Sequence, residues 1–148
     1  MKKLLFLFAG LFLLFTSCKD DDTPQEYKIT GTWKPIKMVQ TTVVDNGQPS
    51  TETFIYESCQ LESRWVFNDD LSGHSLQRKV VNTTCVTQQD AGFTYVYDKN
   101  TGDILIKYIT FEDNGKISDV AENTMNLRIE MINQNVYQSK TYSLVRVQ

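Results

Sequence analysis

The sequence predicts an all-β domain that closes as an eight-stranded antiparallel up-and-down barrel. Beyond residue 27 the chain consists of short β-rich runs of period two, broken at intervals by turn residues, and no long helical stretch competes with them. Tight turns connect strands that follow one another in sequence, so these strands should also be neighbours in the sheet. A closed meander leaves no open edge, which favours the barrel over the alternative of a two-sheet sandwich.

The strands are placed by alternation and by turns. The clearest strand runs from Met125 to Met131, where apolar and polar residues alternate and give one dry and one wet face. Turn-forming residues at 68–73, 98–102 and 112–115 separate consecutive strands. The expected strands are 29–41, 61–67, 73–81, 92–97, 104–111, 116–121, 124–132 and 137–147, with long loops at 42–60 and 82–91, the former irregular or partly helical over 45–60.

Residues 1–17 are expected to be a targeting signal rather than part of the fold. A basic pair at 2–3 precedes an apolar run over 4–15, and two small residues then lead to Cys18. The apolar run is well short of the roughly 20 residues that a helix needs to cross the hydrocarbon core of a membrane. A permanent transmembrane helix is therefore not expected here.

Residues 14–18, with the sequence Leu-Phe-Thr-Ser-Cys, resemble the lipobox of a Gram-negative bacterial lipoprotein. In such signals the final cysteine is acylated and becomes the first mature residue, so the resemblance implies lipid attachment at Cys18 and a membrane partner through that lipid. Phe15 departs from the aliphatic residue usual at its position. An ordinary secretory signal that ends by chance in a cysteine is the alternative.

Residues 18–27 are expected to form a solvated tether, because they contain the acidic run 20–22 and almost nothing to bury. Lys19 followed by this acidic run also resembles the signal that sends some Gram-negative lipoproteins to the outer face of the outer membrane. The chain is therefore expected to be an outer-membrane lipoprotein exposed at the cell surface. A periplasm-facing lipoprotein is the alternative.

Three cysteines are present, and acylation of Cys18 would leave Cys59 and Cys85 as an even pair. A disulfide between these two is expected in an oxidising compartment, with two buried free thiols as the alternative. Residues 28–148 are of a length that favours one domain. The formal net charge of −3, with scattered lysines and no basic patch, gives no reason to expect a nucleic-acid partner.

Gly31-Thr32-Trp33, at the start of the first expected strand, resembles the Gly-x-Trp signature with which lipocalins begin. Glycine lets the backbone pass closely across the closed end of a barrel, and the tryptophan fills that end. In lipocalins a late-strand arginine stacks over this tryptophan, which implies a pair of Trp33 and Arg146. Pro35 departs from the pattern, because it cannot donate to the ladder, and predicts a bulge or edge position.

More specifically, residues 29–147 resemble small lipocalin-like lipoproteins of Gram-negative bacteria. The matching features are a cysteine ahead of the second expected strand and an Asn-Asp turn with a following glycine. In this sequence they are Cys59, Trp65-Val66-Phe67, Asn68-Asp69-Asp70 and Gly73.

Little in the sequence supports catalysis, and no enzyme activity is expected. The one histidine, His74, lies beside a turn with no neighbouring catalytic motif. Neither the cysteine–histidine spacing nor the acidic pairs at 69–70 and 112–113 match a zinc or calcium motif, so no metal is expected. No glycine-rich phosphate loop and no other cofactor motif is present.

The aromatic residues are many for a small barrel, and they either fill it or line a cavity. The leading hypothesis is a non-catalytic module that binds a small apolar or amphipathic ligand inside the barrel. The alternative is a filled barrel that acts as a structural or interaction protein, possible partners being an envelope complex or a secreted enzyme to be inhibited. The residues expected to line a ligand cavity are Trp65, Phe67, Tyr95, Tyr108, Leu127 and Ile129.

Overall fold

The computed structural model describes residues 26–45 and 47–148. The predicted signal and Cys18 lie outside the described residues, as does the predicted tether up to residue 25. No helix in the described ranges has the length and apolar character needed to span a membrane. The described chain is almost entirely β-structure, with a single turn of 3₁₀ helix, η1.

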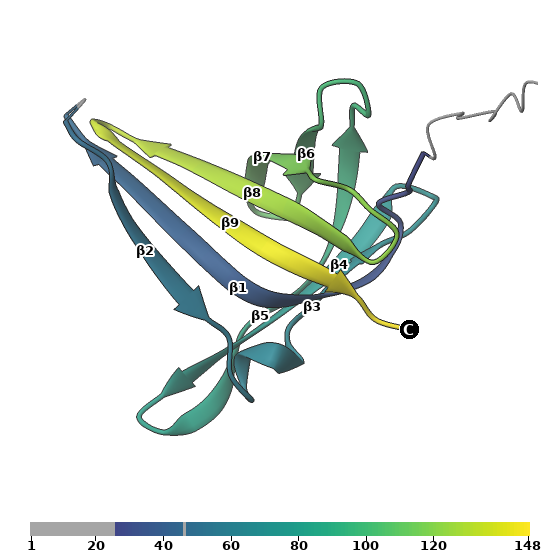
Figure 1. The fold of residues 1–148 in the computed structure, drawn as a ribbon, viewed down its shortest axis with the longest axis horizontal. Coiled ribbons are helices and arrows are strands. Elements are labelled where there is room, and N and C mark those ends of the chain that lie inside the picture. The colour runs from purple at the N-terminus through teal and green to yellow at the C-terminus, as the bar shows by residue number, and fades with distance from the viewer. Residues whose placement is uncertain (1–25, 46) are drawn as a thin grey trace, which may run out of the picture.

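Nine antiparallel strands form one continuous sheet (Figure 1). The long strands β1, β8 and β9 run side by side, with β2 beside β1, and the β4–β5 hairpin extends from the body (Figure 1). The elements are β1 (Gly31–Val44), β2 (Ser50–Ile55), η1 (Gln60–Glu62), β3 (Arg64–Phe67), β4 (Ser72–Val81), β5 (Thr84–Tyr97), β6 (Asp103–Lys107), β7 (Glu112–Ser118), β8 (Thr124–Asn133) and β9 (Val136–Arg146).

The sheet closes because β1 pairs with other strands along both of its edges. One edge of β1 pairs with β9 from Trp33 to Val44, and the start of its other edge pairs with β3. β1 and β3 to β9 therefore form a closed ring of eight strands, in which neighbours beyond β3 follow chain order. The predicted eight-stranded antiparallel barrel is confirmed, and β2 is a ninth strand that extends the wall.

β1 contains the irregularity that Pro35 predicts. Its register with β9 shifts between Pro35 and Lys37, so that Ile36 has no partner in that ladder. Proline has no N–H to donate, and a bulge at this point lets the strand continue without a lost ladder bond. The prediction of a bulge is confirmed.

Several segments differ from the predicted elements. Residues 61–62, expected to begin a strand, belong to η1, and β3 begins only at Arg64. The expected loop 82–91 is mostly the first half of β5, because Asn82 and Thr83, at φ 48° and 70°, make a two-residue hairpin turn from β4. The segment 45–60 contains β2, which the prediction lacks. The expected turn 112–115 is the start of β7, and the connection from β6 lies just before it, where the Tyr108 N–H donates to the Phe111 carbonyl at 2.9 Å.

The core consists of inward side chains in the half of the barrel that Trp33 closes. Aromatic rings contact one another there, with centroids 5.2 Å apart for Phe67 and Tyr95 and 6.1 Å apart for Trp65 and Tyr142. Such packing stabilises the barrel by removing apolar surface from water. The buried apolar residues are Ile29, Trp33, Trp65, Phe67, Phe93, Tyr95, Ile104, Ile106, Tyr108, Ile117, Met125, Leu127, Ile129, Tyr142 and Leu144.

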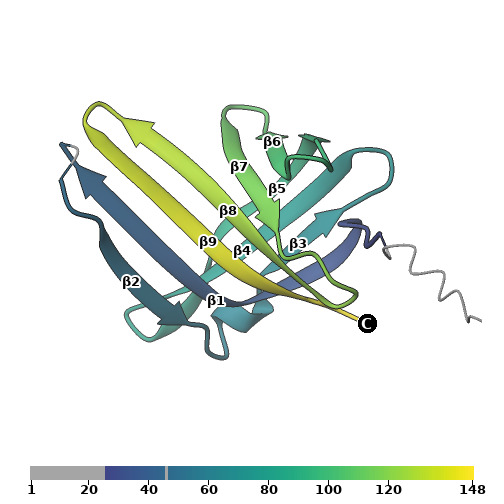
Figure 2. The ribbon, with the colours of Figure 1, turned by 45° about the horizontal axis from the view of Figure 1, so that its top comes forward.

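The two ends of the barrel differ. The first described residues and the C-terminus both lie at the closed end, far from the β8–β9 turn (Figures 1 and 2). At the opposite end the strands spread apart into long hairpins (Figure 2). We call this opposite end the mouth.

The wall is split at the mouth, and a disulfide spans the split. β2 pairs only with β1, while β4 beyond Leu76 pairs only with β5, so no ladder joins β2 to β4. η1 lies against both β1 and β4 at this place. Cys59, just before η1, is bonded to Cys85 at the start of β5. The predicted disulfide is confirmed, and it holds the β4–β5 hairpin to the chain that crosses the split.

Candidate functional site

A small pocket of about 90 Å³ opens where the wall is split. Its floor includes Trp65 and Tyr142, both buried in the aromatic core. One wall comes from β1 and the segment after β2, and the opposite wall comes from the β4–β5 hairpin. The lining residues are Pro35, Met38, Tyr56, Ser63, Trp65, Gln77, Arg78, Gln88, Lys140 and Tyr142.

Arg78 is the most firmly positioned polar residue of the pocket. Its Nη1 donates to Thr87 Oγ1 at 2.6 Å, and its Nη2 lies 3.3 Å from the Glu62 carboxylate. Its backbone N–H donates to Ser63 Oγ at 2.9 Å. Arg78 Nε is buried and has no hydrogen-bond partner within the described ranges. A buried donor without a partner is costly, so Arg78 Nε is a place where a bound acceptor would be favourable.

Lys140 brings a second positive charge from β9. It pairs in register with Ile129 of β8, whose side chain is buried inside the barrel, and so shares the inward face. Asp113 faces inward from β7, opposite the buried Ile106 of β6. Burial raises the pKa of Asp113, and the positive charge of Lys140 partly opposes that rise. The interior of the barrel is therefore polar at the level of Lys140 and Asp113.

A chain of hydrogen bonds connects the pocket to the core. The Gln77 amide donates to Gln89 at 3.3 Å, and the Gln89 amide donates to Ser75 Oγ at 2.7 Å. Ser75 Oγ and the Tyr108 hydroxyl are 3.2 Å apart. Burial raises the pKa of Tyr108 and of Tyr142, so both phenols stay neutral and retain a proton to donate. Neutral hydrogen-bonding groups thus cap the apolar core below the mouth.

The six residues predicted to line a cavity all lie inside the barrel. Their exposed fractions run from 0% to 9%, and they pack against one another and their neighbours. Trp65 is the one member of the six that also lines the pocket. Tyr95 also lines a hollow of about 330 Å³ on the outside of the closed end. The five residues other than Trp65 pack into the closed half. These residues are Phe67, Tyr95, Tyr108, Leu127 and Ile129.

The structure brings Trp33 and Arg146 together at the closed end. The Arg146 guanidinium carbon lies 4.2 Å from the centre of the fully buried Trp33 ring. Arg146 also donates to the carbonyls of Lys28, Thr30 and Glu122 at 2.7 to 2.9 Å. Gly31 has φ 130°, and a Cβ there would collide with this guanidinium. The arginine therefore ties the entry to β1 to the end of β9.

His74 lies on the outside of β4, and its Nε2 is 2.8 Å from the Asp90 carboxylate of β5. Both side chains are about half exposed, which makes this a surface pair away from the pocket. Within residues 26–45 and 47–148, no three histidine, cysteine or acidic side chains gather in a way that would hold a metal ion.

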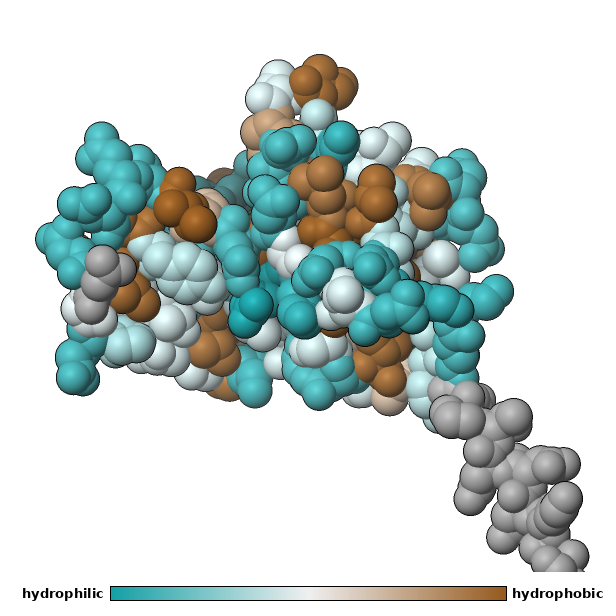
Figure 3. Space-filling view, turned by 90° about the horizontal axis from the view of Figure 1, so that it is seen from above, coloured by the Kyte–Doolittle hydropathy of each residue, from teal (hydrophilic) through white to brown (hydrophobic). Residues whose placement is uncertain are grey.

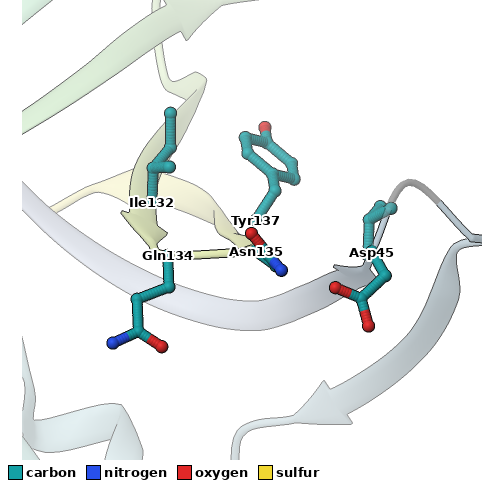
Figure 4. A pocket seen from close by; sticks show the side chains of 6 residues that line it. Asp45, Ile132, Gln134, Asn135 and Tyr137 are labelled. Carbon is teal, nitrogen blue, oxygen red and sulfur yellow. The ribbon is translucent and has the colours of Figure 1, made fainter.

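Two larger hollows lie on the outside of the barrel. One of about 320 Å³ lies at the mouth-end tip, where Ile132 and Tyr137 point to one side and Gln134 and Asp45 to the other (Figure 4). The other, about 330 Å³, lies at the closed end and is lined by Tyr27, Leu71 and Tyr97 among others. On the face shown in Figure 3, apolar side chains form separate patches divided by polar ones.

Sequence reasoning missed the polar residues of the pocket. Arg78 and Lys140 are single cations within predicted strands, a pattern more typical of a solvated face. Tyr56 falls in a segment expected to be irregular, and Gln88 in an expected loop. The one available signal was that Lys140 has the same parity as Tyr142 and Leu144 on the last strand.

A family model described as a lipocalin-like domain matches residues 29–135. Among solved structures, the chain is similar to a deswapped triple mutant of bovine odorant-binding protein, at 12% identity and a TM-score of 0.46, over 80% of this chain and 73% of that chain. It is also similar to a dog lipocalin allergen, at 13% identity and a TM-score of 0.48, over 80% of this chain and 74% of that chain. No curated protein matches the sequence.

Proposed function

The chain belongs to the lipocalin-like domain family, and on that premise we propose that its barrel binds a small amphipathic ligand at the mouth without changing it chemically. The lipocalin fold generally binds small hydrophobic ligands. In this chain the closed half is filled by aromatic side chains, so the place for a ligand is the pocket at the split wall and the space directly above it.

The observation that carries this proposal is the combination of an apolar floor and a polar wall in one pocket. Trp65 and Tyr142 offer ring surface, and Met38 of β1 offers a thioether on the same inward face. Phe54 of β2 pairs with Met38 and is partly exposed beside it. Exposed apolar side chains that point into a mouth are typical of a surface that a ligand covers.

We predict that the domain, residues 23–148, purified from an extract of its own host, carries a bound small molecule. Native mass spectrometry would show a reproducible mass above that of the polypeptide, and organic extraction would release it. A ligand that buries apolar surface in a preformed pocket survives purification when its dissociation is slow. A clean unliganded mass, with no shift when fatty acids or sterol-like probes are added, would count against ligand binding.

We further propose that the protein is an outer-membrane lipoprotein exposed at the cell surface, anchored through Cys18. The lipobox-like residues 14–18 and the acidic tether support this location. The first described residues begin at the closed end, so such an anchor would leave the mouth directed away from its attachment point (Figure 1). A lipid-tethered binding protein of this kind would present its pocket to the surroundings.

We predict that the chain, expressed in a Gram-negative host, incorporates an alkyne-labelled palmitate analogue and partitions into the detergent phase. Cys18→Ser removes the acceptor thiol, so both the label and the partitioning should be lost. Cys85→Ser is the matched control, since it also removes one cysteine and should keep the label. A Cys18→Ser chain that is labelled as strongly as the natural chain would rule out anchoring at this residue.

A second candidate function is that of an interaction protein. Ile109, in the β6–β7 turn, is 99% exposed, and Ile132, beside the β8–β9 turn, is 78% exposed. Exposed aliphatic side chains on hairpin tips are typical of contact surfaces for partner proteins. A specific partner that is captured by the natural chain and lost with Ile109→Ser or Ile132→Ser would favour this candidate over ligand binding.

A further inference from the structure

The charge pattern of the pocket narrows the class of ligand, an inference that rests on the proposed function. Arg78 of β4 and Lys140 of β9 both line the pocket, and no acidic side chain of the described residues belongs to its lining. We propose that the pocket binds the carboxylate of an aliphatic acid between Arg78 and Lys140. The aliphatic chain then leaves through the mouth.

Arg78 is oriented before a ligand arrives. Thr87 Oγ1 and the Glu62 carboxylate hold its two terminal nitrogens, while its Nε remains buried and without a partner within the described ranges. Arginine presents its N–H groups in a fixed fork that matches the two oxygens of a carboxylate. A positioned guanidinium with an unsatisfied donor therefore favours an anionic acceptor over a neutral ligand.

Lys140 is available for the same ligand. No ion pair of the described residues includes its ammonium group. Asp113 interacts with it electrostatically from β7 but does not line the pocket. Lys140 thus supplies a positive charge from β9, whereas Arg78 supplies one from β4, and Tyr56, whose hydroxyl is a donor, is a further member of the lining.

Size decides which part of the ligand the pocket holds. A volume of about 90 Å³ has room for a carboxylate and its first carbons, and not for a whole lipid chain. Beyond the pocket, Phe54 and Met131 face inward at the mouth and are partly exposed. An aliphatic chain that packs on these side chains removes their apolar surface from water. The geometry therefore fits an amphiphile with a buried acid group.

The test compares three probes with the same eight-carbon chain: octanoate, 1-octanol and octylamine. Isothermal titration uses residues 23–148, which contain every described strand and the disulfide, without detergent because detergent would compete for the mouth. Octanoate should bind at least about tenfold more tightly than the other two, since charge-assisted hydrogen bonds are the stronger ones. Equal binding of 1-octanol or octylamine would overturn the carboxylate inference and leave the proposed function standing.

Substitutions test whether Arg78 and Lys140 are the groups that bind the carboxylate of octanoate. Arg78→Gln and Lys140→Gln should each weaken octanoate binding by about tenfold, the loss expected for one charge-assisted contact, and should weaken 1-octanol binding by a smaller factor because the alcohol carries no charge. Lys107→Gln, on the exposed face of β6, is the matched control and should bind octanoate as the natural chain does. Thermal melting checks that Arg78→Gln folds. Lys140→Gln removes no ion pair within the described ranges and so keeps the test valid if Arg78→Gln does not fold.

Unchanged octanoate binding in both variants would overturn the proposal. Saturable binding of none of the three probes would overturn it as well. In that case the search for a ligand that co-purifies with the domain decides the proposed function independently.

Discussion

Trp33→Ala is expected to lower the free energy of unfolding by about 4 kcal/mol, the range typical of a large aromatic residue removed from a core. The side chain is fully buried, its Nε1 donates to the Ile29 carbonyl at 2.7 Å, and the Arg146 guanidinium covers its ring. The substitution removes all three contacts and leaves a cavity at the closed end. Urea unfolding followed by circular dichroism measures the loss.

Trp33→Phe separates the contribution of the aromatic ring from that of the indole N–H and the extra volume. It keeps an aromatic ring under Arg146 but loses the N–H donor and part of the volume, so its loss should be smaller than that of Trp33→Ala. Val96→Ala, at an exposed position of β5, serves as the background and should change stability by less than about 0.5 kcal/mol. If Trp33→Ala lost no more than Val96→Ala, the closed end would not depend on this ring.

Reduction of the disulfide is expected to lower the free energy of unfolding by about 3 kcal/mol, because it releases the constraint that the bond places on the unfolded chain. The bond joins Cys59 to Cys85, 26 residues apart in sequence. It also crosses the split wall, where no strand ladder would take over its role. The paired substitution Cys59→Ser with Cys85→Ser should show the same loss.

Reductant provides the internal control for this second prediction. Thermal unfolding of the natural chain should shift to lower temperature when reductant is added, whereas the doubly substituted chain should melt at one temperature in both buffers. A natural chain whose melting temperature does not respond to complete reduction would show that the strand ladders alone hold the β4–β5 hairpin.

The barrel itself was predictable because most of its strands bury one face. In β8 the alternation of Met125, Leu127 and Ile129 with polar residues marks the inward side directly. The disulfide followed from counting cysteines, once one of the three was assigned to the lipid. These predictions depend on local patterns that a buried face must produce.

The segments that prediction missed have both faces exposed or carry turn residues inside a strand. β2 and the first half of β5 have exposed or half-exposed residues on both faces, so no apolar alternation is required there. Glu112-Asp113-Asn114-Gly115 resembles a turn in sequence but begins β7. Gly115 fits there because a side chain at this position would collide with the Arg128 carbonyl of β8.

The pocket was less predictable than the fold. Alternation along each strand placed Trp65 and Leu127 inside, yet whether inward residues fill the barrel or line a hollow depends on how far the surrounding strands extend. Arg78 lines the pocket at a point where the register between β4 and β5 shifts. Lys140 lines it because β9 continues past the packed core. Both effects are set by pairing across the sheet and leave no local pattern.

The pairing of β1 with β9 has a kinetic consequence. It joins strands from nearly opposite ends of the described chain, from Trp33 with Arg146 to Val44 with Val136, so the contacts that close the ring are among the most distant in sequence. Folds dominated by such contacts form on a timescale of about milliseconds to seconds, because a long loop must close before the contacts stabilise it. Until β9 arrives, β1 and β8 each present an open edge. Pairing of β9 therefore covers both of these edges and removes two sites at which another chain could pair, whereas the outer edge of β2 and one edge of β4 beyond Leu76 stay without a ladder partner.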